Sequence, residues 1–273
     1  MRSINVFYKV LYCLTFSSLL CFSAYAQLPA CNNQQLSYQP ALSTDLQALP
    51  NVDDFSVLVW NTYKGQKSTW HQQLSHLSRN VDFMLLQEVS QRQINVWPLS
   101  EQWFRYQAKA FEWRGDQLGV MNLAKFASAK SCLVLSPEPW IRLPKSALLQ
   151  LYRWGDEELL IINVHSINFT LGDEDYQQQL TRLQVWLSHY KGAVILAGDF
   201  NTWSEGRLAV LQRFVRSLQL RAARFEPDLR SHFFGKTLDH VFYRGLELKA
   251  STSIATDASD HNALVLRLGF VKH

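Results

Sequence analysis

The sequence predicts a layered α/β sandwich, in which two packed sheets carry helices on their outer faces. Near-continuous apolar runs recur along the chain, only a few segments have helical spacing, and several shorter strand-like segments follow. The chain has 273 residues, of which 47% are hydrophobic and 18% charged. This length is sufficient for one large core, and the composition excludes disordered, collagen-like and polytopic membrane proteins.

The four longest apolar runs indicate strands that are covered on both faces. They span residues 55–60, 81–86, 159–164 and 193–197. Shorter strands are expected at 118–124, 131–135, 146–152, 238–243, 246–254 and 263–268, and helices at 69–79, 173–190 and 206–220. No internal repeat or linker divides residues 55–273, which we therefore interpret as one domain.

The first 26 residues have the pattern of an export signal. A basic start with Arg2 and Lys9 precedes an apolar run, and Ala24 and Ala26 form the small-x-small pattern of a cleavage site. The alternative is a membrane anchor, but a bilayer requires about 20 apolar residues and this run is shorter and interrupted by Ser and Thr. We expect an exported protein, periplasmic or secreted, with no stable membrane span after signal cleavage.

Residues 27–54 contain three prolines and little periodicity, which is typical of an extended lead-in before the domain at 55–273. Two cysteines, Cys31 and Cys132, remain after removal of the leader. In an oxidising compartment they are candidates for a disulfide, and two unrelated buried thiols are the alternative. Lipid attachment at Cys31 also stays open, although Pro29 fits a lipoprotein processing site poorly.

The formal charge is +4, and Arg2 and Lys9 in the leader account for two of these positive charges, which leaves +2. So small an excess argues neither for nor against a polyanionic partner. Two regions could nevertheless contact nucleic acid. Aromatic residues alternate with basic ones over 103–117, and six arginines lie between 207 and 230. The alternative is that the aromatics fill the core and the arginines lie on a solvated helix face.

Polar side chains stand where the predicted strands end. These residues are Asn61, Glu88, Asn163, His165, Asp199 and Asn201, and Asp239, Asp260 and His261 follow near the C-terminus. Singly, an Asp or Asn after a strand most often caps a turn or helix. Together, they are expected to converge on one cleft, because α/β sheets place their chemistry at strand ends.

The expected cleft is rich in oxygen ligands. Its carboxylates (Glu88, Asp199, Asp260) and amides (Asn61, Asn163, Asn201) suit Mg²⁺ or Mn²⁺ rather than zinc. The imidazoles of His165 and His261 can donate hydrogen bonds to a phosphate or move protons, and Asp239 can orient His261. This combination predicts metal-dependent hydrolysis of a phosphate ester.

The order Trp60-Asn61, Gln87-Glu88, Asn163-x-His165, Gly198-Asp199-Phe200-Asn201, Leu238-Asp239 and Ser259-Asp260-His261 resembles the endonuclease/exonuclease/phosphatase superfamily, the enzymes with a DNase I-like fold. The resemblance implies a four-layer α/β sandwich with two central mixed β-sheets flanked by helices. It also implies that Asn61 and Glu88 belong to the metal site, which Asp260 supports. His165 and Asn201 would contact the scissile phosphate, Asp199 would orient or deprotonate the attacking water, and His261, paired with Asp239, would serve in acid-base or phosphate-stabilising work.

One departure from the superfamily pattern follows the first Asn. Many relatives have an acidic residue or glycine there, whereas this chain has Thr62, Tyr63 and Lys64, which leaves a second metal ligand open. Lys64 is a candidate phosphate contact, and a solvated loop charge is its alternative role. With Asn163 and Asn168 it completes the expected substrate-binding set.

We expect a monomeric nuclease that acts on DNA or RNA. The alternative is a phosphatase or phosphodiesterase acting on small-molecule or lipid phosphates, to which the low net charge gives some support. A catalytically silent binding module is a third possibility, and the complete set of candidate ligands argues against it.

Overall fold

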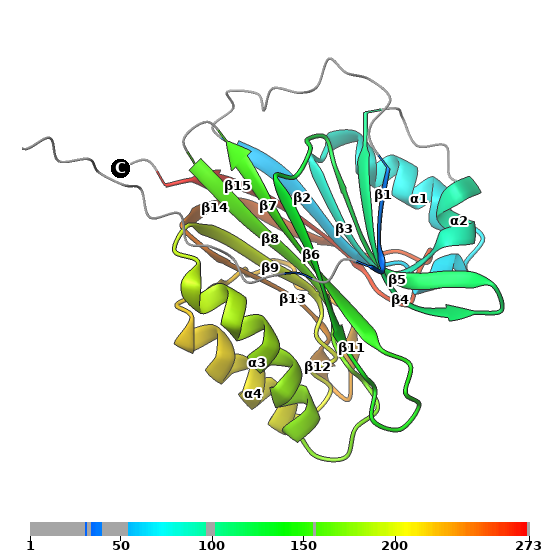
Figure 1. Cartoon of the computed structure of the whole chain (residues 1–273). Coiled ribbons are helices and arrows are strands. Elements are labelled where there is room, and N and C mark those ends of the chain that lie inside the picture. Colours follow the sequence, from blue (N-terminus) through cyan, green and yellow to red (C-terminus); the bar gives the residue numbers. More distant parts are fainter. Residues whose placement is uncertain (1–30, 32–33, 40–53, 97–101, 155–156, 272–273) are drawn as a thin grey trace, which may run out of the picture.

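The computed structural model describes residues 31, 34–39, 54–96, 102–154 and 157–271. Two mixed sheets pack face to face, with helices on both outer sides (Figure 1). The larger sheet has the strand order β1 (Leu36–Gln39), β4 (Phe104–Trp113), β5 (Asp116–Ala124), β3 (Phe83–Ser90), β2 (Asp54–Asn61), β15 (Ala263–Phe270) and β14 (Leu246–Ile254). The smaller sheet runs β10 (Arg221–Ala222), β13 (Asp239–Arg244), β9 (Ala193–Asp199), β8 (Glu157–His165), β7 (Lys145–Trp154) and β6 (Lys130–Ser136).

The helices form the two outer layers. Helices α3 (Glu174–His189) and α4 (Glu205–Ser217) cover the smaller sheet, and α1 (Trp70–Leu77) and α2 (Gln91–Val96) lie at the larger one (Figure 1). Two short 3₁₀ turns, η2 (Tyr63–Gly65) and η3 (Ser78–Asn80), flank α1, and β11 (His232–Phe233) and β12 (Lys236–Thr237) form a separate hairpin. The predicted four-layer sandwich is confirmed.

Three apolar layers hold this arrangement together. The central layer lies between the sheets, where Phe55, Phe83 and Leu85 meet Ile161 and Ile195. In the outer layer over the smaller sheet, the predicted stripe Leu180, Leu183 and Leu187 of α3 is buried. Trp70 and Leu74 of α1 bury the opposite face of the larger sheet. Strands covered on both faces explain why their sequences read as unbroken apolar runs.

Several elements lie outside the sequence-based expectation, among them β1, β4, α2 and the β11–β12 hairpin. The lead-in contains an edge strand, since β1 pairs antiparallel with β4. The aromatic and basic segment at 103–117 is a β-hairpin, in which Trp103, Phe104 and Tyr106 are buried. These three aromatic side chains pack in the core and are not available to stack on bases.

A disulfide joins Cys31 to Cys132 of β6, with 5.4 Å between their Cα atoms. It fastens the N-terminal segment to the smaller sheet. The predicted leader, residues 1–26, lies outside the described residues, as does most of 27–54. Within the described part of the chain, no helix combines the length and hydrophobicity needed to span a bilayer.

Candidate active site

Strand register brings the site residues together at one edge of the sandwich. In the smaller sheet, His165 of β8 lies beside Asp199 of β9, and Asp239 of β13 pairs with Asp199 from the other side. In the larger sheet, Asn61 of β2 lies beside Gln87 of β3, which precedes Glu88. Each sheet therefore supplies one half of the site.

Asp199 is the centre of the group. Its Oδ2 accepts a hydrogen bond from Asn61 Nδ2 at 3.0 Å, which links the two halves, and its Oδ1 accepts from the backbone amide of Asn201 at 2.9 Å. Burial raises the pKa of Asp199 to about 6, although the nearby His261 imidazole opposes the shift. The carboxyl group is therefore poised to exchange a proton near neutral pH.

The glycine before Asp199 is required by the fold. Gly198 has φ of +137°, and a Cβ built there would lie 2.0 Å from the carbonyl oxygen of Val164 on the neighbouring strand. Only glycine allows β8 and β9 to approach so closely, and this approach sets Asp199 beside His165.

His261 is held by a carboxylate. Its Nδ1 lies 2.7 Å from Asp239 Oδ2, and its Nε2 points to Asp199 Oδ2 at 3.9 Å. Burial alone would disfavour the imidazolium, but the negative charges of Asp239, Asp199 and Asp260 outweigh burial and raise the pKa of His261 to about 10. His261 is therefore a cation at neutral pH.

His165 faces the same oxygen from the other side, with Nε2 at 3.6 Å from Asp199 Oδ2. Burial, with the positive charges of Lys145, His261 and Lys64, lowers the pKa of His165 well below its usual range, so this imidazole is neutral. Its Nε2 also lies 2.9 Å from Nζ of Lys145. Burial lowers the pKa of Lys145, which Glu88 and Asp199 partly counteract.

Glu88 enters the site from a strained backbone position. It has φ of +51°, within a bulge that shifts the pairing of β3 with β5 between Leu86 and Val89. The left-handed conformation is unfavourable for a non-glycine residue and is frequent at functional sites. Lys64, which also has positive φ, forms an ion pair with Glu88, and Glu88 Oε1 lies 3.8 Å from His165 Nε2.

The donor set fits a hard divalent cation. Glu88 and Asp199 provide carboxylate oxygens and Asn61 an amide oxygen, and such ligands suit Mg²⁺ or Mn²⁺. One ligand atom each of Asp199, Asp239 and His261 also lies within 4.8 Å of the others, but Asp239 and His261 already satisfy each other. The ammonium of Lys64 already neutralises Glu88, so a cation at Glu88 would share or displace that charge.

Two buried charged residues fix the loop that follows β8. The Glu138 carboxylate accepts hydrogen bonds from the backbone amides of Asn168 and Phe169 at 2.7 and 2.8 Å. Arg207, at the start of α4, donates to the carbonyls of Ile167, Asn168 and Asn201 and to the Thr170 hydroxyl. We call this arrangement the Glu138–Arg207 clamp. It shows Arg207 to be a structural residue and not part of a basic surface.

Most of the predicted residues lie at this edge. Two differ from the others: Asn163 is in the interior, and Asp260 is exposed. Asn163 lies two residues before His165 on the same face of β8, and its side chain points into the interior between the sheets. It is fully buried, donates to Leu86 O, Met121 O and Asn122 Oδ1, and accepts from Gln87 Nε2. We call these contacts the inter-sheet seam, and they correct the expectation that Asn163 binds substrate.

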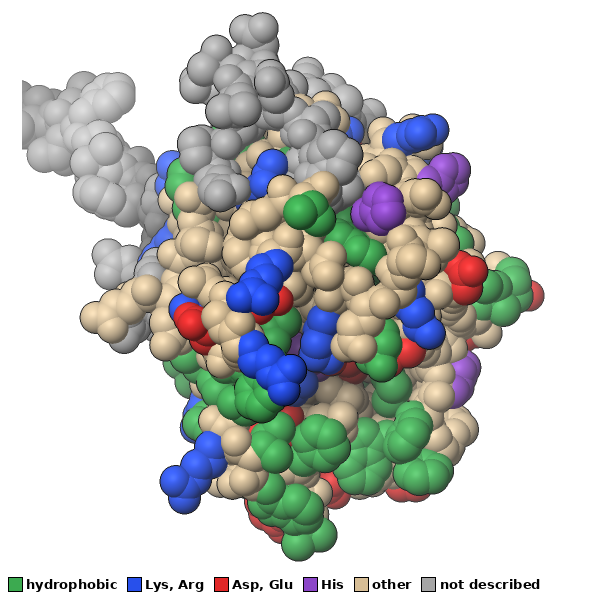
Figure 2. Space-filling model, turned by 90° about the vertical axis from the view of Figure 1, so that its right-hand side faces the viewer, with side chains coloured by type: hydrophobic (Ala, Val, Ile, Leu, Met, Phe, Trp, Pro, Cys, Tyr) green, Lys and Arg blue, Asp and Glu red, His purple; other side chains and the backbone are tan. Residues whose placement is uncertain are grey.

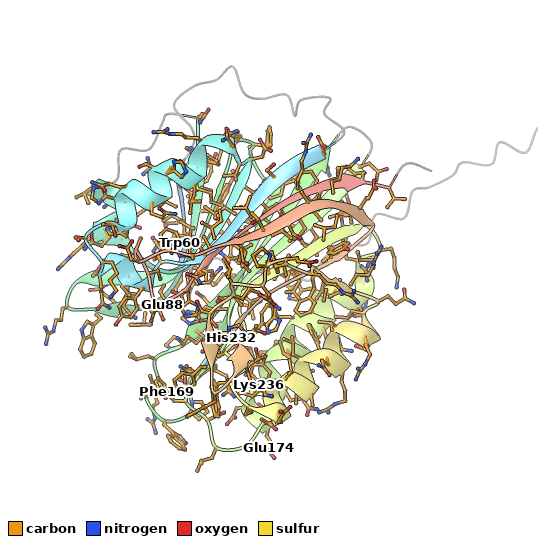
Figure 3. All side chains as sticks on the ribbon, turned by 180° about the vertical axis from the view of Figure 1, so that it is seen from behind. Trp60, Glu88, Phe169, Glu174, His232 and Lys236 are labelled. Atoms are coloured by element: carbon orange, nitrogen blue, oxygen red, sulfur yellow. A yellow bond between two sulfur atoms is a disulfide. The ribbon has the colours of Figure 1, made fainter. Side chains whose placement is uncertain are left out.

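Asp260 lies beside His261 but is exposed, and its carboxylate accepts a hydrogen bond from Ser259 at 3.3 Å. Its role at the metal site stays a prediction. Asn168 is fixed by the clamp and accepts a hydrogen bond from Trp203 at 2.9 Å. Asn201 has φ of +49° and donates from Nδ2 to Ser166 O at 2.9 Å. In the view from behind, Glu88 lies below Trp60 and above Phe169 (Figure 3).

Sequence reasoning missed Lys145. The search considered residues after apolar runs, whereas Lys145 begins β7. Because β7 is antiparallel to β8, its first residues reach the edge at which β8 ends. A charged residue just before an apolar run was the signal that could have found it.

Known proteins are similar to this chain over most of its length. Residues 58–261 match the Endonuclease/Exonuclease/phosphatase family. A UPF0294 protein from Vibrio cholerae is 45% identical over 222 residues, which cover 78% of this chain and 77% of the relative.

Solved structures share the fold. An endonuclease/exonuclease/phosphatase from Beutenbergia cavernae aligns with a TM-score of 0.63 and 16% identity, over 80% of this chain and 72% of the other. The catalytic domain of human Nocturnin, with bound sulfate, aligns with a TM-score of 0.62 and 17% identity, over 89% and 100% of the two chains. The chain belongs to the endonuclease/exonuclease/phosphatase family.

Proposed function

We propose that the protein is a divalent-metal-dependent hydrolase of phosphodiesters. One observation carries the proposal: a neutral imidazole and a cationic imidazole face the same carboxylate oxygen, with Nε2 atoms at 3.6 and 3.9 Å from Asp199 Oδ2. These separations exceed ordinary hydrogen-bond lengths, so a water molecule set against the three groups could donate to the carboxylate and accept from the cationic imidazole.

Asp199 acts on the nucleophile. Its carboxylate accepts a proton from the attacking water, whose oxygen bonds to phosphorus while the bond from phosphorus to the leaving oxygen breaks. Asn61 and the Asn201 amide hold this carboxylate in place. The leaving oxygen then takes up the proton that Asp199 accepted, which regenerates the carboxylate, so that the overall change adds one water across the ester.

His261 and Lys145 stabilise the phosphate. His261 carries its positive charge because Asp239 is bonded to Nδ1, which leaves Nε2–H to donate to a phosphoryl oxygen. On the other side, the Lys145 ammonium donates one hydrogen bond to Nε2 of neutral His165 at 2.9 Å and keeps its other N–H groups for the phosphate. Asn61 and Glu88 would hold the Mg²⁺ or Mn²⁺ ion, which supplies Lewis-acid stabilisation of the charge that develops on the phosphoryl group.

The expected preference for nucleic acid has lost part of its support. Trp103, Phe104 and Tyr106 belong to the core, and Arg207 belongs to the clamp. We therefore propose phosphodiester hydrolysis without proposing a nucleic-acid-binding surface. DNA and RNA are still included among the substrates of the test. We further propose that the protein is exported to the periplasm or the medium and that it is a monomer. The Cys31–Cys132 disulfide supports the export, because such bonds persist in oxidising compartments.

The test uses the purified protein with Mg²⁺ or Mn²⁺ and with a chelator. The substrates are bis(4-nitrophenyl) phosphate, 4-nitrophenyl phosphate, plasmid DNA, single-stranded DNA and RNA. We expect metal-dependent hydrolysis of the diester, lost in Asp199→Asn and His261→Ala. The matched control is His71→Ala, which removes an exposed histidine of α1. Hydrolysis that survives the chelator, or that both site variants retain, contradicts the proposal.

A further inference from the structure

The phosphate end of the site opens into an apolar cavity. The cavity has a volume of about 300 Å³, and Lys64, Glu88, Lys145 and His165 line one side of it. The remaining lining is largely apolar and includes Ala110, Phe111, Leu118, Ile141, Leu143 and Phe169. A phosphoester bound by the two lysines would place one of its esterified groups against this wall.

The Ser146 hydroxyl and the side-chain oxygen of Asn168 on the cavity wall already bond to protein partners. The Ser146 hydroxyl donates to Ala108 O at 3.0 Å and accepts from the Val120 amide at 3.2 Å. Asn168 Oδ1 accepts from the Trp203 indole. A nucleobase needs partners for the polar groups on its edge, and leaving them unpaired on burial costs free energy. The wall therefore favours an apolar group.

Exposed hydrophobic side chains lie on the two loops that supply Ile141 and Phe169 to the cavity lining. Trp140 and Ile141 lie on the loop between β6 and β7, and Phe169 and Leu171 lie on the loop after β8; their exposed fractions are 59%, 49%, 53% and 76%. We call these four residues the apolar rim. The Glu138–Arg207 clamp holds both loops, so Phe169 is exposed on a backbone that is firmly bonded.

The rim extends towards the β11–β12 hairpin. Phe233 and Phe234 are exposed there, and the labelled residues His232, Lys236 and Phe169 all lie at the lower end of the sandwich (Figure 3). The same end carries the hairpin in the first view (Figure 1). Figure 2 shows hydrophobic side chains gathered over the lower part of one face, below a group of Lys and Arg side chains. Large apolar patches beside polar groups mark surfaces that contact a partner or a membrane.

From the charged end, the apolar wall and the exposed rim, we infer that the substrate class is a membrane-lipid phosphodiester, taken from a lipid surface. The phosphate lies at Lys64, Lys145 and His165, the adjoining apolar part of the lipid enters the cavity, and the apolar rim contacts the surface. This inference rests on the proposed phosphodiester hydrolysis.

The first test measures binding and hydrolysis separately. Vesicles of phosphatidylcholine with phosphatidylglycerol serve as the lipid probe, bis(4-nitrophenyl) phosphate as the soluble diester and a single-stranded oligonucleotide as the nucleic-acid probe. We expect the protein to sediment with the vesicles and to hydrolyse their lipid in the presence of Mg²⁺ or Mn²⁺.

Matched variants test the rim. Ile141→Ser and Phe169→Ser should each lower vesicle binding, and the ratio of lipid to soluble-diester turnover, by about tenfold, because each removes an apolar side chain that would be buried in lipid. The control is Val185→Ser on α3, since Val185 has the same 49% exposed fraction as Ile141. An equal effect of the control and the rim variants overturns the inference.

The outcomes separate the two proposals. Hydrolysis of the soluble diester without vesicle binding overturns the lipid inference and leaves the proposed function intact. Cleavage of the oligonucleotide in preference to lipid replaces the lipid by nucleic acid. Absence of hydrolysis with every probe overturns the proposed function, and the substrate inference fails with it.

Discussion

Replacing Asp239 with Asn should change the pH dependence of hydrolysis. The carboxylate lies 2.7 Å from Nδ1 of His261 and contributes to raising the pKa of this imidazole to about 10. The amide keeps the size of the side chain but removes the charge. Without that charge, the pKa of His261 should fall, because only Asp199 and Asp260 then oppose the effect of burial.

The size of the effect follows from the titration. At pH 8, a histidine with a pKa of about 10 is almost fully protonated, whereas one with a pKa of about 6.5 is about 3% protonated. If imidazolium stabilises the phosphate, kcat/KM at pH 8 should fall, by up to about thirtyfold in the limit where the pKa returns to 6.5, and the loss should shrink towards pH 6. The raised pKa also predicts that the wild-type rate holds up to about pH 9 before it declines.

The assay is hydrolysis of bis(4-nitrophenyl) phosphate from pH 5.5 to 9.5 at saturating Mg²⁺. Two controls are needed: a thermal melt, to show that the variant is folded, and a Mg²⁺ activation curve, to show that metal affinity is unchanged. A loss of the same size at every pH, with an unshifted alkaline limb, would refute the assignment of the charge on His261 to Asp239.

Three further outcomes concern stability. Gly198→Ala should lower the free energy of unfolding in urea by about 3 kcal/mol, because the new Cβ would meet Val164 O at 2.0 Å; an unchanged midpoint would show that β9 can move away. Glu138→Gln should cost about 2–4 kcal/mol in the same assay, because the carboxamide can accept at only one oxygen where two amides donate; unfolding as in the wild type would contradict the clamp. The third concerns His240, whose pKa is lowered to about 4, chiefly by burial. Below pH 6.5, the ordinary pKa of about 6.5 lets His240 bind a proton in the unfolded chain, whereas the buried imidazole of the folded chain stays neutral down to about pH 4. The free energy of unfolding therefore keeps its full value above about pH 6.5 and decreases by up to about 3 kcal/mol as the pH falls towards 4. His240→Gln should flatten that part of the pH–stability curve, and an unaltered slope there would count against it.

Most of the fold was predictable because buried strands and amphipathic helices leave clear local patterns. The strands and helices that escaped prediction depend on distant partners. β1 is four residues of edge strand that exist through pairing with β4, and no local pattern specifies that pairing. In β4, the alternation of aromatic and polar residues left a base-stacking surface and core packing both open, because a half-buried strand has the same period as such a surface.

The site was predictable where a motif ends a strand, and less so where depth or direction matters. Asn163 and His165 share a face of β8, but two residues of strand separate a position in the interior from one at the edge. Lys145 reaches the site from the beginning of an antiparallel strand. The clamp residues Glu138 and Arg207 carry charges that sequence assigns to the surface, and only the three-dimensional contacts explain their burial.

The inter-sheet seam has a consequence for catalysis. Apolar sheets in contact can slide by small steps with little loss, since dispersion and burial have no direction. The hydrogen bonds that the Asn163 amide donates to Leu86 O, Met121 O and Asn122 are directional and prevent such sliding. If one sheet moved by one residue relative to the other, several buried donors and acceptors would lose their partners at once. Glu88 belongs to one sheet and Asp199 to the other, so the distance between them is constant only if the two sheets keep the same relative position. By fixing that position, the inter-sheet seam fixes the spacing of the two carboxylates.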